Sequence, residues 1–368
     1  MAKHTDPLSW WEPVFGPEEA EAAAAVVRTG FLNEGPVTDA FTKRMADVLG
    51  VKHVLATCNG TAALFLALKA CGVGRGDEVI VPDLTFIATA NAVALCGATP
   101  APADVRPHDL TLDPVAVRAA LTRRTRAVVP VHVNGRAADL DSLGEIARAH
   151  GLAVVEDAAQ ALGSRRHDRS LGTWGDAGCI SLAPTKIISS GQGGLVLTDR
   201  DDLRDAVVRL KDHGRLARAW NHHPQLGFNF KFTDLHAAVA NAQLDRLGPR
   251  LELARRQFRR YADALAGLPG ITFLDTDLRG GSVPLWVDAL VQDARGLIAF
   301  LEARRIVCRP FWPAIHTQAC HARAGAFPHA TYAADHGVWF PSGVGKSDAD
   351  LDEVIGAVRA FLLGKSGD

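Results

Sequence analysis

Short, mainly apolar segments alternate with longer segments rich in alanine and leucine through the first half of the chain. Four of the apolar segments are predicted to be strands: residues 53–57, 77–82, 126–133 and 152–159. Three of the segments that follow them are predicted to be helices: residues 61–70, a segment through Asn91, and residues 140–150. Nearly continuous apolar strands that alternate with helices are typical of a mostly parallel sheet with helices on both faces.

This alternation changes after residue 175. Two apolar segments then follow each other with little helix between them, and both are predicted to be strands: residues 175–182 and 193–198. A long helical region is predicted to begin near Asp234 and to continue toward Ala266. Beyond it, one strand and two helices are predicted: residues 282–290, 294–305 and 348–363.

The change of pattern indicates two domains. We expect a large domain with a mostly parallel, mixed sheet at residues 1–245 and a smaller α+β domain at residues 246–368. The N-terminal segment is a candidate to pack on the small domain. A chain of 368 residues is long enough to bury a core in each of them.

Composition narrows the classes of partner. The 40 basic residues nearly balance the 41 acidic ones, so no overall field favours nucleic acid or an anionic membrane. The first residues lack the apolar region of a secretion signal, and no apolar run is long enough to span a bilayer. We therefore expect a cytoplasmic protein that binds neither nucleic acid nor a membrane.

The distribution of cysteine and histidine gives no indication of a metal site. The six cysteines are scattered without a CxxC pair, and no histidines have the spacing of zinc ligands. We expect reduced thiols and no bound metal.

Lys186 is the first candidate for chemistry, because it is the only Asp, Glu, Lys or Arg between Ala177 and Thr198. One interpretation is structural: the side chain runs along apolar surface and its ammonium reaches water. The other is chemical: burial lowers the pKa of the amine, and the neutral amine attacks a carbonyl carbon. Lys186 by itself does not decide between them.

Two further segments place polar groups at the ends of predicted strands. Asn59, Gly60 and Thr61 join a strand to a helix, where free N–H groups and the helix dipole can hold a phosphate. Asp157 follows an apolar strand, and Gln160 stands three residues later. In both segments the alternative interpretation is an ordinary helix cap.

Two aromatic segments are more ambiguous. Phe86 lies at a strand-to-helix junction, where it could stack on a flat ring or belong to the core. Asn229 lies among aromatic residues and is followed by Lys231, and a simple turn explains an asparagine there equally well. Taken together with the phosphate cradle, the carboxylate and the amine, however, these groups are the ones needed to hold pyridoxal phosphate (PLP).

Nine longer motifs make the combination specific. They are GFLNEGP (30–36), NGTAAL (59–64), GDEVIVPDLTFIATANAV (76–93), PVHVNGRAADL (130–140), VVEDAAQALG (154–163), SLAPTKIISSGQGG (181–194), KDHG (211–214), GFNFKFTDLHAA (227–238) and RPFWPAIH (309–316). Through them the chain resembles, from about Pro13 to its C-terminus, the DegT/DnrJ/EryC1/StrS family of nucleotide-sugar aminotransferases. The resemblance implies an α/β fold of the fold-type I, aspartate aminotransferase-like class of PLP-dependent transferases.

The resemblance also implies roles for individual residues. Lys186 resembles the lysine that forms a Schiff base with PLP, and Asp157 resembles the partner of the pyridine nitrogen. The other cofactor-binding positions that match the family are Gly60, Thr61 and Ser181 at the phosphate, Phe86 on the ring face, Gln160 near the ring hydroxyl, and Asn229. In the family this asparagine comes from a neighbouring subunit, which implies a homodimer with shared active sites.

The implied reaction moves an amino group from an amino acid, glutamate in the family, to a keto sugar linked to a nucleotide. Lysine rather than histidine at position 186 favours transamination over dehydration. The resemblance is to the perosamine-synthase-like branch, which acts at C4 of a GDP-linked 4-keto-6-deoxy sugar. Three alternatives remain: a 3-keto or dTDP/UDP-linked sugar, a keto-cyclitol, or a regulatory homologue that binds without turnover.

Three residues are candidate contacts for the diphosphate, the sugar or the donor carboxylate: Lys231, Arg309 and His316. Each of them could equally be a surface charge. The chain departs from the family pattern at Gln192, where the family often has glutamate, and at Lys231, where it often has arginine. These departures affect the identity of the substrate and remove no expected PLP ligand.

Overall fold

The computed structural model describes residues 7–216 and 221–364. In these ranges, seven strands form a large sheet in the order β1-β9-β8-β5-β4-β2-β3. Their bounds are β1 His53–Thr57, β2 Glu78–Pro82, β3 Thr99–Ala103, β4 Thr125–Val128, β5 Ala153–Asp157, β8 Ala177–Ser181 and β9 Gly194–Thr198. β9 pairs antiparallel with both of its neighbours, and the other six strands run in one direction. The expected mostly parallel, mixed sheet is therefore confirmed.

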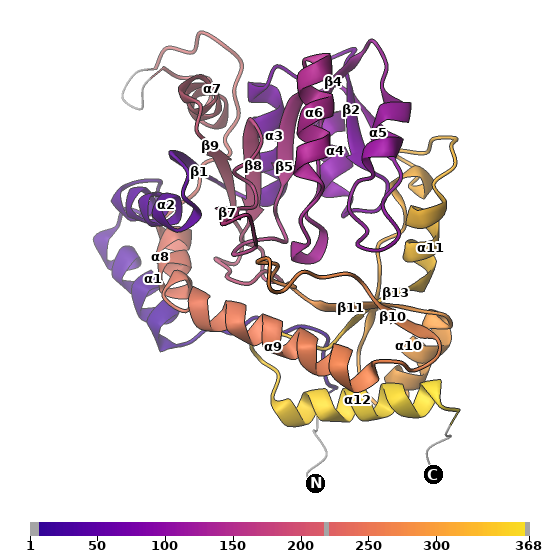
Figure 1. Cartoon of the computed structure of the whole chain (residues 1–368). Coiled ribbons are helices and arrows are strands. Elements are labelled where there is room, and N and C mark those ends of the chain that lie inside the picture. Colours follow the sequence, from indigo (N-terminus) through magenta and orange to yellow (C-terminus); the bar gives the residue numbers. More distant parts are fainter. Residues whose placement is uncertain (1–6, 217–220, 365–368) are drawn as a thin grey trace.

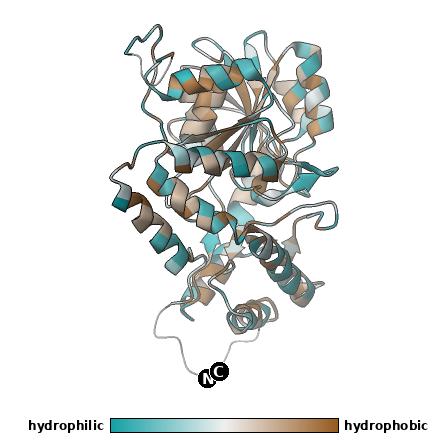
Figure 2. Cartoon of the chain, turned by 90° about the vertical axis from the view of Figure 1, so that its left-hand side faces the viewer, coloured by the Kyte–Doolittle hydropathy of each residue, from teal (hydrophilic) through white to brown (hydrophobic). Residues whose placement is uncertain are grey.

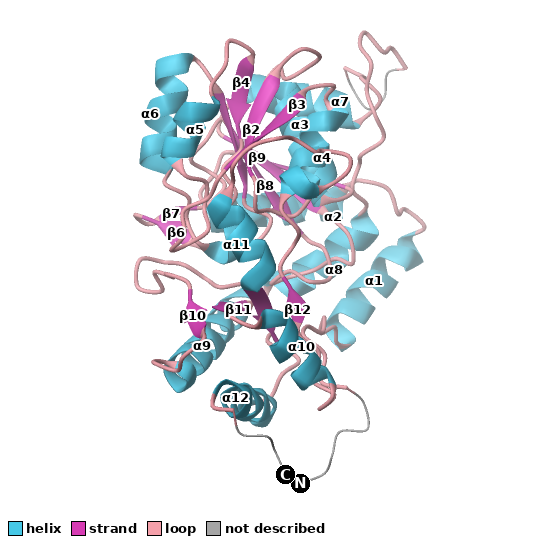
Figure 3. Cartoon of the chain, turned by 90° about the vertical axis from the view of Figure 1, so that its right-hand side faces the viewer, coloured by secondary structure: helices cyan, strands magenta, loops and turns pink. Residues whose placement is uncertain are grey.

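Helices cover both faces of this sheet (Figures 1 and 3). One face carries α3 (Gly60–Ala70), α4 (Ala88–Leu95) and α7 (Asp201–Lys211), and the other carries α5 (Pro114–Ala120) and α6 (Leu140–His150). The strands β2, β8 and β9 are fully buried and mostly apolar, as expected for strands that are covered on both faces. In Figure 2 the large sheet is accordingly mostly brown, whereas the helices around it alternate teal and brown positions.

Three more helices pack together beside β1: α1 (Pro17–Thr29), α2 (Pro36–Leu49) and α8 (Asp234–Leu244). The sequence predicts one helical region from Asp234 toward Ala266, but the structure divides it into α8 and α9 (Leu247–Leu265). Pro249 explains the division. A proline inside a continuous helix would lose the bond to the carbonyl of Asp245 and collide with it, whereas in the first turn of α9 it is tolerated.

α9 leads from the large sheet to a second, antiparallel sheet in the order β10-β11-β13-β12 (Figure 1). Its strands are β10 Ile271–Phe273, β11 Val287–Val291, β12 Arg309–Pro310 and β13 Gly337–Phe340, and its helices are α10 Ala294–Glu302, α11 Pro328–His336 and α12 Asp348–Leu362. The strand predicted at 282–290 begins only at Val287, because residues before it bond to the large domain instead of to a neighbouring strand. The N-terminal segment lies against this part of the chain, where the N–H of Leu8 donates to the carbonyl of Arg305 at 2.8 Å.

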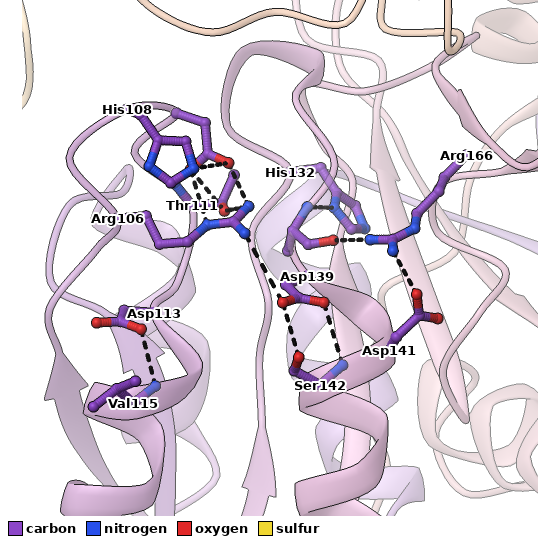
Figure 4. Close-up of polar contacts among 12 residues, drawn as sticks. Arg106, His108, Thr111, Asp113, Val115, His132, Asp139, Asp141, Ser142 and Arg166 are labelled. Carbon is purple, nitrogen blue, oxygen red and sulfur yellow. Dashed lines mark hydrogen bonds and ion pairs between the residues drawn. The ribbon is translucent and has the colours of Figure 1, made fainter.

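Polar contacts fix the loops at one end of the large sheet (Figure 4). Asp139 caps α6 by accepting hydrogen bonds from the N–H and the hydroxyl of Ser142 at 3.2 and 2.9 Å. The N–H of Ala138 donates to Nδ1 of His132 at 3.2 Å, so the loop before α6 is tied to the end of the strand region. Arg166, in the short hairpin of β6 (Arg165–Arg166) and β7 (Arg169–Ser170), closes the group by pairing with Asp141.

No helix in residues 7–216 and 221–364 is both long enough and apolar enough to cross a membrane.

Candidate active site

Several of the predicted site residues meet at the carboxyl ends of β5 and β8, which are neighbours in the sheet. Asp157 is the last residue of β5 and Ser181 the last residue of β8. A small cavity at this edge is lined by Ala159, Gln160, Leu162, Ser181, Lys186, Ile187, Val283 and Leu285. Residues far apart in the sequence come together here because ligands of parallel α/β sheets bind where the strands end.

Lys186 lies in a turn that follows β8, with its N–H donating to the carbonyl of Ala183 at 3.0 Å. Part of the side chain is accessible, but the amine is deep enough that burial lowers its pKa to about 8. The charge of Asp157 acts in the opposite direction and favours the ammonium form. The amine nitrogen lies 5.2 Å from the ring centre of Trp286, within the range of a cation–π contact.

Three distant side chains hold the turn that carries Lys186. Nε1 of Trp11 donates to the carbonyl of Pro184 at 3.1 Å, and Nε1 of Trp286 donates to the carbonyl of Thr185 at 3.2 Å. The guanidinium of Arg250 donates to the carbonyl of Ile187 at 3.1 Å. Sequence reasoning missed all three residues, since nothing in their local sequence connects them with position 186.

Asp157 is 6% exposed, and both of its carboxylate oxygens accept hydrogen bonds. The hydroxyl of Thr89 donates to one oxygen at 2.8 Å, and the N–H of Ala159 donates to the other at 3.1 Å. These two hydrogen bonds fix the orientation of the carboxylate. Thr89 was not predicted, although it lies in the motif that contains Phe86.

Gln160 is oriented by the backbone of Asn134. Its Oε1 accepts the N–H of Asn134 at 2.9 Å, and a backbone N–H can bond only to the oxygen end of the side-chain amide. The NH2 end is therefore the end left to donate toward a ligand. Asn134 is a further residue that sequence reasoning did not identify.

The start of α3 leaves space beside Ser181. Asn59 caps the helix by accepting the N–H of Ala62 at 2.8 Å, so the capping interpretation holds for this residue. Gly60 begins the helix, and a Cβ added there would lie 3.1 Å from Cβ and 3.3 Å from Oγ of Ser181. Glycine thus keeps open a gap between a helix N-terminus, with Thr61 in its first turn, and a serine hydroxyl.

Phe86 lies between β2 and α4 and is 52% exposed, so it is not a core residue of the chain. Its ring centre is 6.2 Å from that of Trp312, at an interplanar angle of 57°. Trp312 belongs to the predicted RPFWPAIH motif, so the structure brings this motif beside the ring-face candidate.

Comparison with known proteins decides the family. The sequence pattern of the DegT/DnrJ/EryC1/StrS aminotransferase family matches residues 13–359. The chain belongs to this family. The resemblance inferred from the motifs is confirmed, and with it the prediction of an aminotransferase.

Two relatives are proteins named GDP-perosamine synthase. The one from Caulobacter vibrioides is 37% identical over 332 residues, which cover 88% of this chain and 89% of the relative. The one from Vibrio cholerae is 32% identical over 362 residues, which cover 96% and 98%. Among solved structures, DesV of S. venezuelae in complex with a ketimine intermediate superimposes with a TM-score of 0.90, at 34% identity and with 95% of each chain covered. The predicted fold class is confirmed.

In this aminotransferase, Asn229 is exposed, and its backbone forms a bridge with Asp212. Within the described residues of one chain, no hydrogen bond joins its side chain to Lys186, Asp157 or Ser181. Phe228 and Phe230 on either side of it pack on the α3 residue Phe65, with ring centres 5.1 and 5.9 Å away. The segment is thus anchored to α3 while Asn229 faces outward.

The three candidate substrate contacts of the aminotransferase each have a partner inside the chain. Nζ of Lys231 donates to Asp212 at 2.8 Å, and the guanidinium carbon of Arg309 lies 5.1 Å from the ring centre of Trp10. Nδ1 of His316 lies 2.6 Å from the buried carboxyl of Asp83, whose pKa is raised by burial. These residues are not brought into the cavity beside Lys186, and their substrate roles stay predictions.

Proposed function

We propose that this aminotransferase binds PLP through Lys186 and transfers the amino group of glutamate to C4 of a GDP-linked 4-keto-6-deoxy sugar. The observation that carries the cofactor assignment is the buried Lys186 amine, whose pKa is lowered to about 8, at the strand ends that carry Asp157 and Ser181. The two relatives named GDP-perosamine synthase support the sugar.

The groups at the site fit the parts of PLP. The gap between Gly60 and Ser181 offers helix N–H groups and a hydroxyl to a phosphate. Asp157, held in place by Thr89 and Ala159, suits a protonated pyridine nitrogen. The free NH2 end of Gln160 suits a ring oxygen, and Phe86 offers an exposed aromatic face.

When it is bound, PLP withdraws electrons from the carbon that carries the amino group, so that this carbon can lose and regain a proton. The chain's own residues supply the rest. Lys186 in its neutral form accepts a proton at Nζ and returns it, since its pKa lies near physiological pH. Asp157 would hold a proton on the ring nitrogen, and the N–H groups at the start of α3 would bind the phosphate.

We further propose that the active form is a homodimer in which Asn229 completes the site of the partner subunit. Asn229 is exposed, its segment is fixed to α3 by Phe228 and Phe230, and α3 begins at the proposed phosphate site. A rigid segment that presents a polar amide to solvent suits a contact made across a subunit interface.

The test begins with the absorbance spectrum of the purified protein, where bound PLP gives a visible band that glutamate should bleach. Lys186→Ala should lose the glutamate response and all transamination while retaining its fold. The enzyme is then offered GDP-, dTDP- and UDP-linked 4-keto and 3-keto sugars with glutamate as donor. Preference for the GDP-linked 4-keto sugar supports the proposal. Preference for another sugar overturns the substrate, and full turnover by Lys186→Ala overturns the role of the lysine.

A further inference from the structure

A chain of contacts connects the two cavity residues Gln160 and Lys186 through Asn134 and Trp286. The N–H of Asn134 donates to Oε1 of Gln160 at 2.9 Å. The side-chain amide of Asn134 forms a reciprocal pair with the backbone of Trp286: its Oδ1 accepts the N–H at 2.8 Å, and its Nδ2 donates to the carbonyl at 2.9 Å. The indole of Trp286 in turn bonds to Thr185 and lies 5.2 Å from the Lys186 amine.

Asn134 has the conformation that this bridge requires. Its φ and ψ are 50° and 36°, in the left-handed region, where asparagine is among the few residues other than glycine that occur readily. It is 1% exposed, so each of its polar groups needs a partner inside the protein. The next residue, Gly135, has a φ of 80°, and a Cβ there would lie 1.9 Å from the carbonyl oxygen of Val283. The turn at Asn134 and Gly135 is therefore in close contact with the segment that leads from Val283 to Trp286.

A buried ion pair also joins the segment around Asn134 to the segment around Trp286. Two residues after Asn134, Arg136 donates to both oxygens of Asp288, which stands two residues after Trp286, at 3.0 and 2.9 Å. Both side chains are almost fully buried. Asn134 and Arg136 thus join the end of the large sheet to the beginning of β11 by four hydrogen bonds in parallel.

We propose that Asn134 is a positioning residue of the active site, which fixes the Gln160 amide as a donor and holds the Trp286 indole against Lys186. The inference deepens the proposed function and relies on it for the role of Lys186 as the reactive amine. Asn134 touches neither the amine nor a ligand, and it acts through Gln160 and Trp286. Its contribution is to keep the lysine enclosed, and enclosure is the cause that lowers the pKa of this amine.

Asn134→Gly is the sharpest variant. Glycine keeps the left-handed backbone and the N–H that Gln160 accepts, but it loses both bonds to Trp286. The indole keeps its bond to Thr185, but the released backbone of Trp286 lets it shift, so water should reach the amine and the pKa of Lys186 should rise from about 8 toward the ordinary value of lysine.

The readout is reductive methylation of Lys186 by formaldehyde and cyanoborohydride in the cofactor-free, full-length protein, followed over pH by peptide mass spectrometry. Only the neutral amine reacts, so the midpoint of the pH–rate profile reports the pKa. We expect a midpoint near pH 8 in the wild type, and in Asn134→Gly a midpoint higher by about one unit, with about tenfold slower methylation below it.

Tyr261→Phe is the matched control. It removes a buried bond from a side chain to the backbone, the 2.8 Å bond from the Tyr261 hydroxyl to the carbonyl of Pro341, inside the small domain. It should lower the thermal midpoint without moving the methylation profile. If Asn134 had only a structural role, Asn134→Gly would also lower the thermal midpoint without moving the methylation profile. An unchanged methylation profile in Asn134→Gly would therefore overturn the proposal.

Trp286→Leu tests the route, and it serves as the second variant if Asn134→Gly does not fold. It should raise the midpoint by itself, and adding Asn134→Gly to it should cause no further change, because the residue through which Asn134 acts is gone. Independent, additive shifts would contradict the inference. Methylation requires no PLP. If the protein never bound PLP, the proposed function would be wrong, but the methylation profiles would still test the role of Asn134.

Discussion

A lysine amine is a nucleophile only when it is neutral, and in water at neutral pH nearly every lysine is protonated. At position 186, burial shifts this balance and lowers the pKa to about 8, against the opposing charge of Asp157. The neutral form is then well populated at slightly alkaline pH. The carboxylate of Asp157 is held in place by hydrogen bonds from Thr89 and Ala159.

From this low pKa we predict how a substitution of Lys186 changes the stability of the cofactor-free protein. Because Lys186 binds its proton more weakly in the folded state, Lys186→Met should raise the free energy of unfolding at pH 7 by about 1–2 kcal/mol, a value reduced for partial exposure. Above about pH 8 the folded wild type loses this proton while the unfolded chain keeps it, so wild-type stability rises with pH and the difference shrinks. Urea denaturation at pH 7 and at pH 10 measures this, with the exposed Lys43→Met as control. A difference that does not depend on pH would contradict the assignment.

The carboxylate gives the second prediction. Asp157→Asn removes the charge that holds a proton on the cofactor ring while keeping the acceptor for Thr89, so PLP should stay bound and kcat should fall by more than about 100-fold. The measurements are the visible absorbance of the bound cofactor and the rate of glutamate half-transamination. Asp168→Asn, in the exposed turn between β6 and β7, should leave both unchanged. Wild-type rates in Asp157→Asn would exclude the proposed role.

At the scale of single elements, the start of α3 offers N–H groups to an anion, and the rest of the helix packs on the sheet. Asn59 satisfies one N–H of its first turn, and Gly60 leaves the others open beside Ser181. An eleven-residue helix from Gly60 to Ala70 has a dipole large enough to favour an anion at this end. The rest of the helix is buried against the sheet, so the anion site is fixed with respect to β8 and the Lys186 turn.

We therefore expect Gly60→Val to act on the phosphate alone. Its side chain would fill the gap in which Ser181 already lies 3.1 Å from the position of a Cβ. Affinity for PLP should fall by about tenfold or more, whereas affinity for pyridoxal, which lacks the phosphate, should change little. Equilibrium titrations of the cofactor-free protein compare the two ligands. Gly74→Val, where a Cβ would meet nothing within 4 Å, is the matched control. Equal losses for both ligands would place the phosphate elsewhere.

At the scale of the whole molecule, the active site depends on three parts of the chain meeting at one edge of the large sheet. The N-terminal segment provides Trp11, the segment before β11 provides Trp286, and α9 provides Arg250, and all three bond to the turn that carries Lys186. In the proposed homodimer, the exposed Asn229 would add a fourth part, from a second copy of the chain.

The shared site predicts complementation between two inactive variants. Lys186→Ala and Asn229→Ala should each be poorly active as homodimers. After mixing, unfolding and refolding, half of the sites in a mixed dimer would combine Lys186 from one chain with Asn229 from the other, so activity should reappear. Transamination before and after mixing measures this, and refolding each variant alone is the control. If both residues act within one chain, no activity returns.

The sequence by itself determined what depends on neighbouring positions. Alternating apolar and helical segments gave the layered fold, because burial on both faces of a parallel strand requires a nearly continuous apolar sequence. Lys186, Asp157 and the Gly60 turn became candidates because each stands out from its own neighbours. The break at Asp245 was also encoded locally, in Pro249, but the prediction overlooked it.

Only the tertiary structure decided which distant residues control these groups. Trp11 and Trp286 lie 173 and 101 residues from their bonding partners in the Lys186 turn, and Asn134 lies 152 residues from Trp286. Such contacts follow from the packing of whole elements and leave no periodic or local signal in the sequence. For the same reason the depressed pKa of Lys186 could be suspected from its apolar surroundings, but its cause, enclosure by segments from the rest of the chain, appears only in the fold.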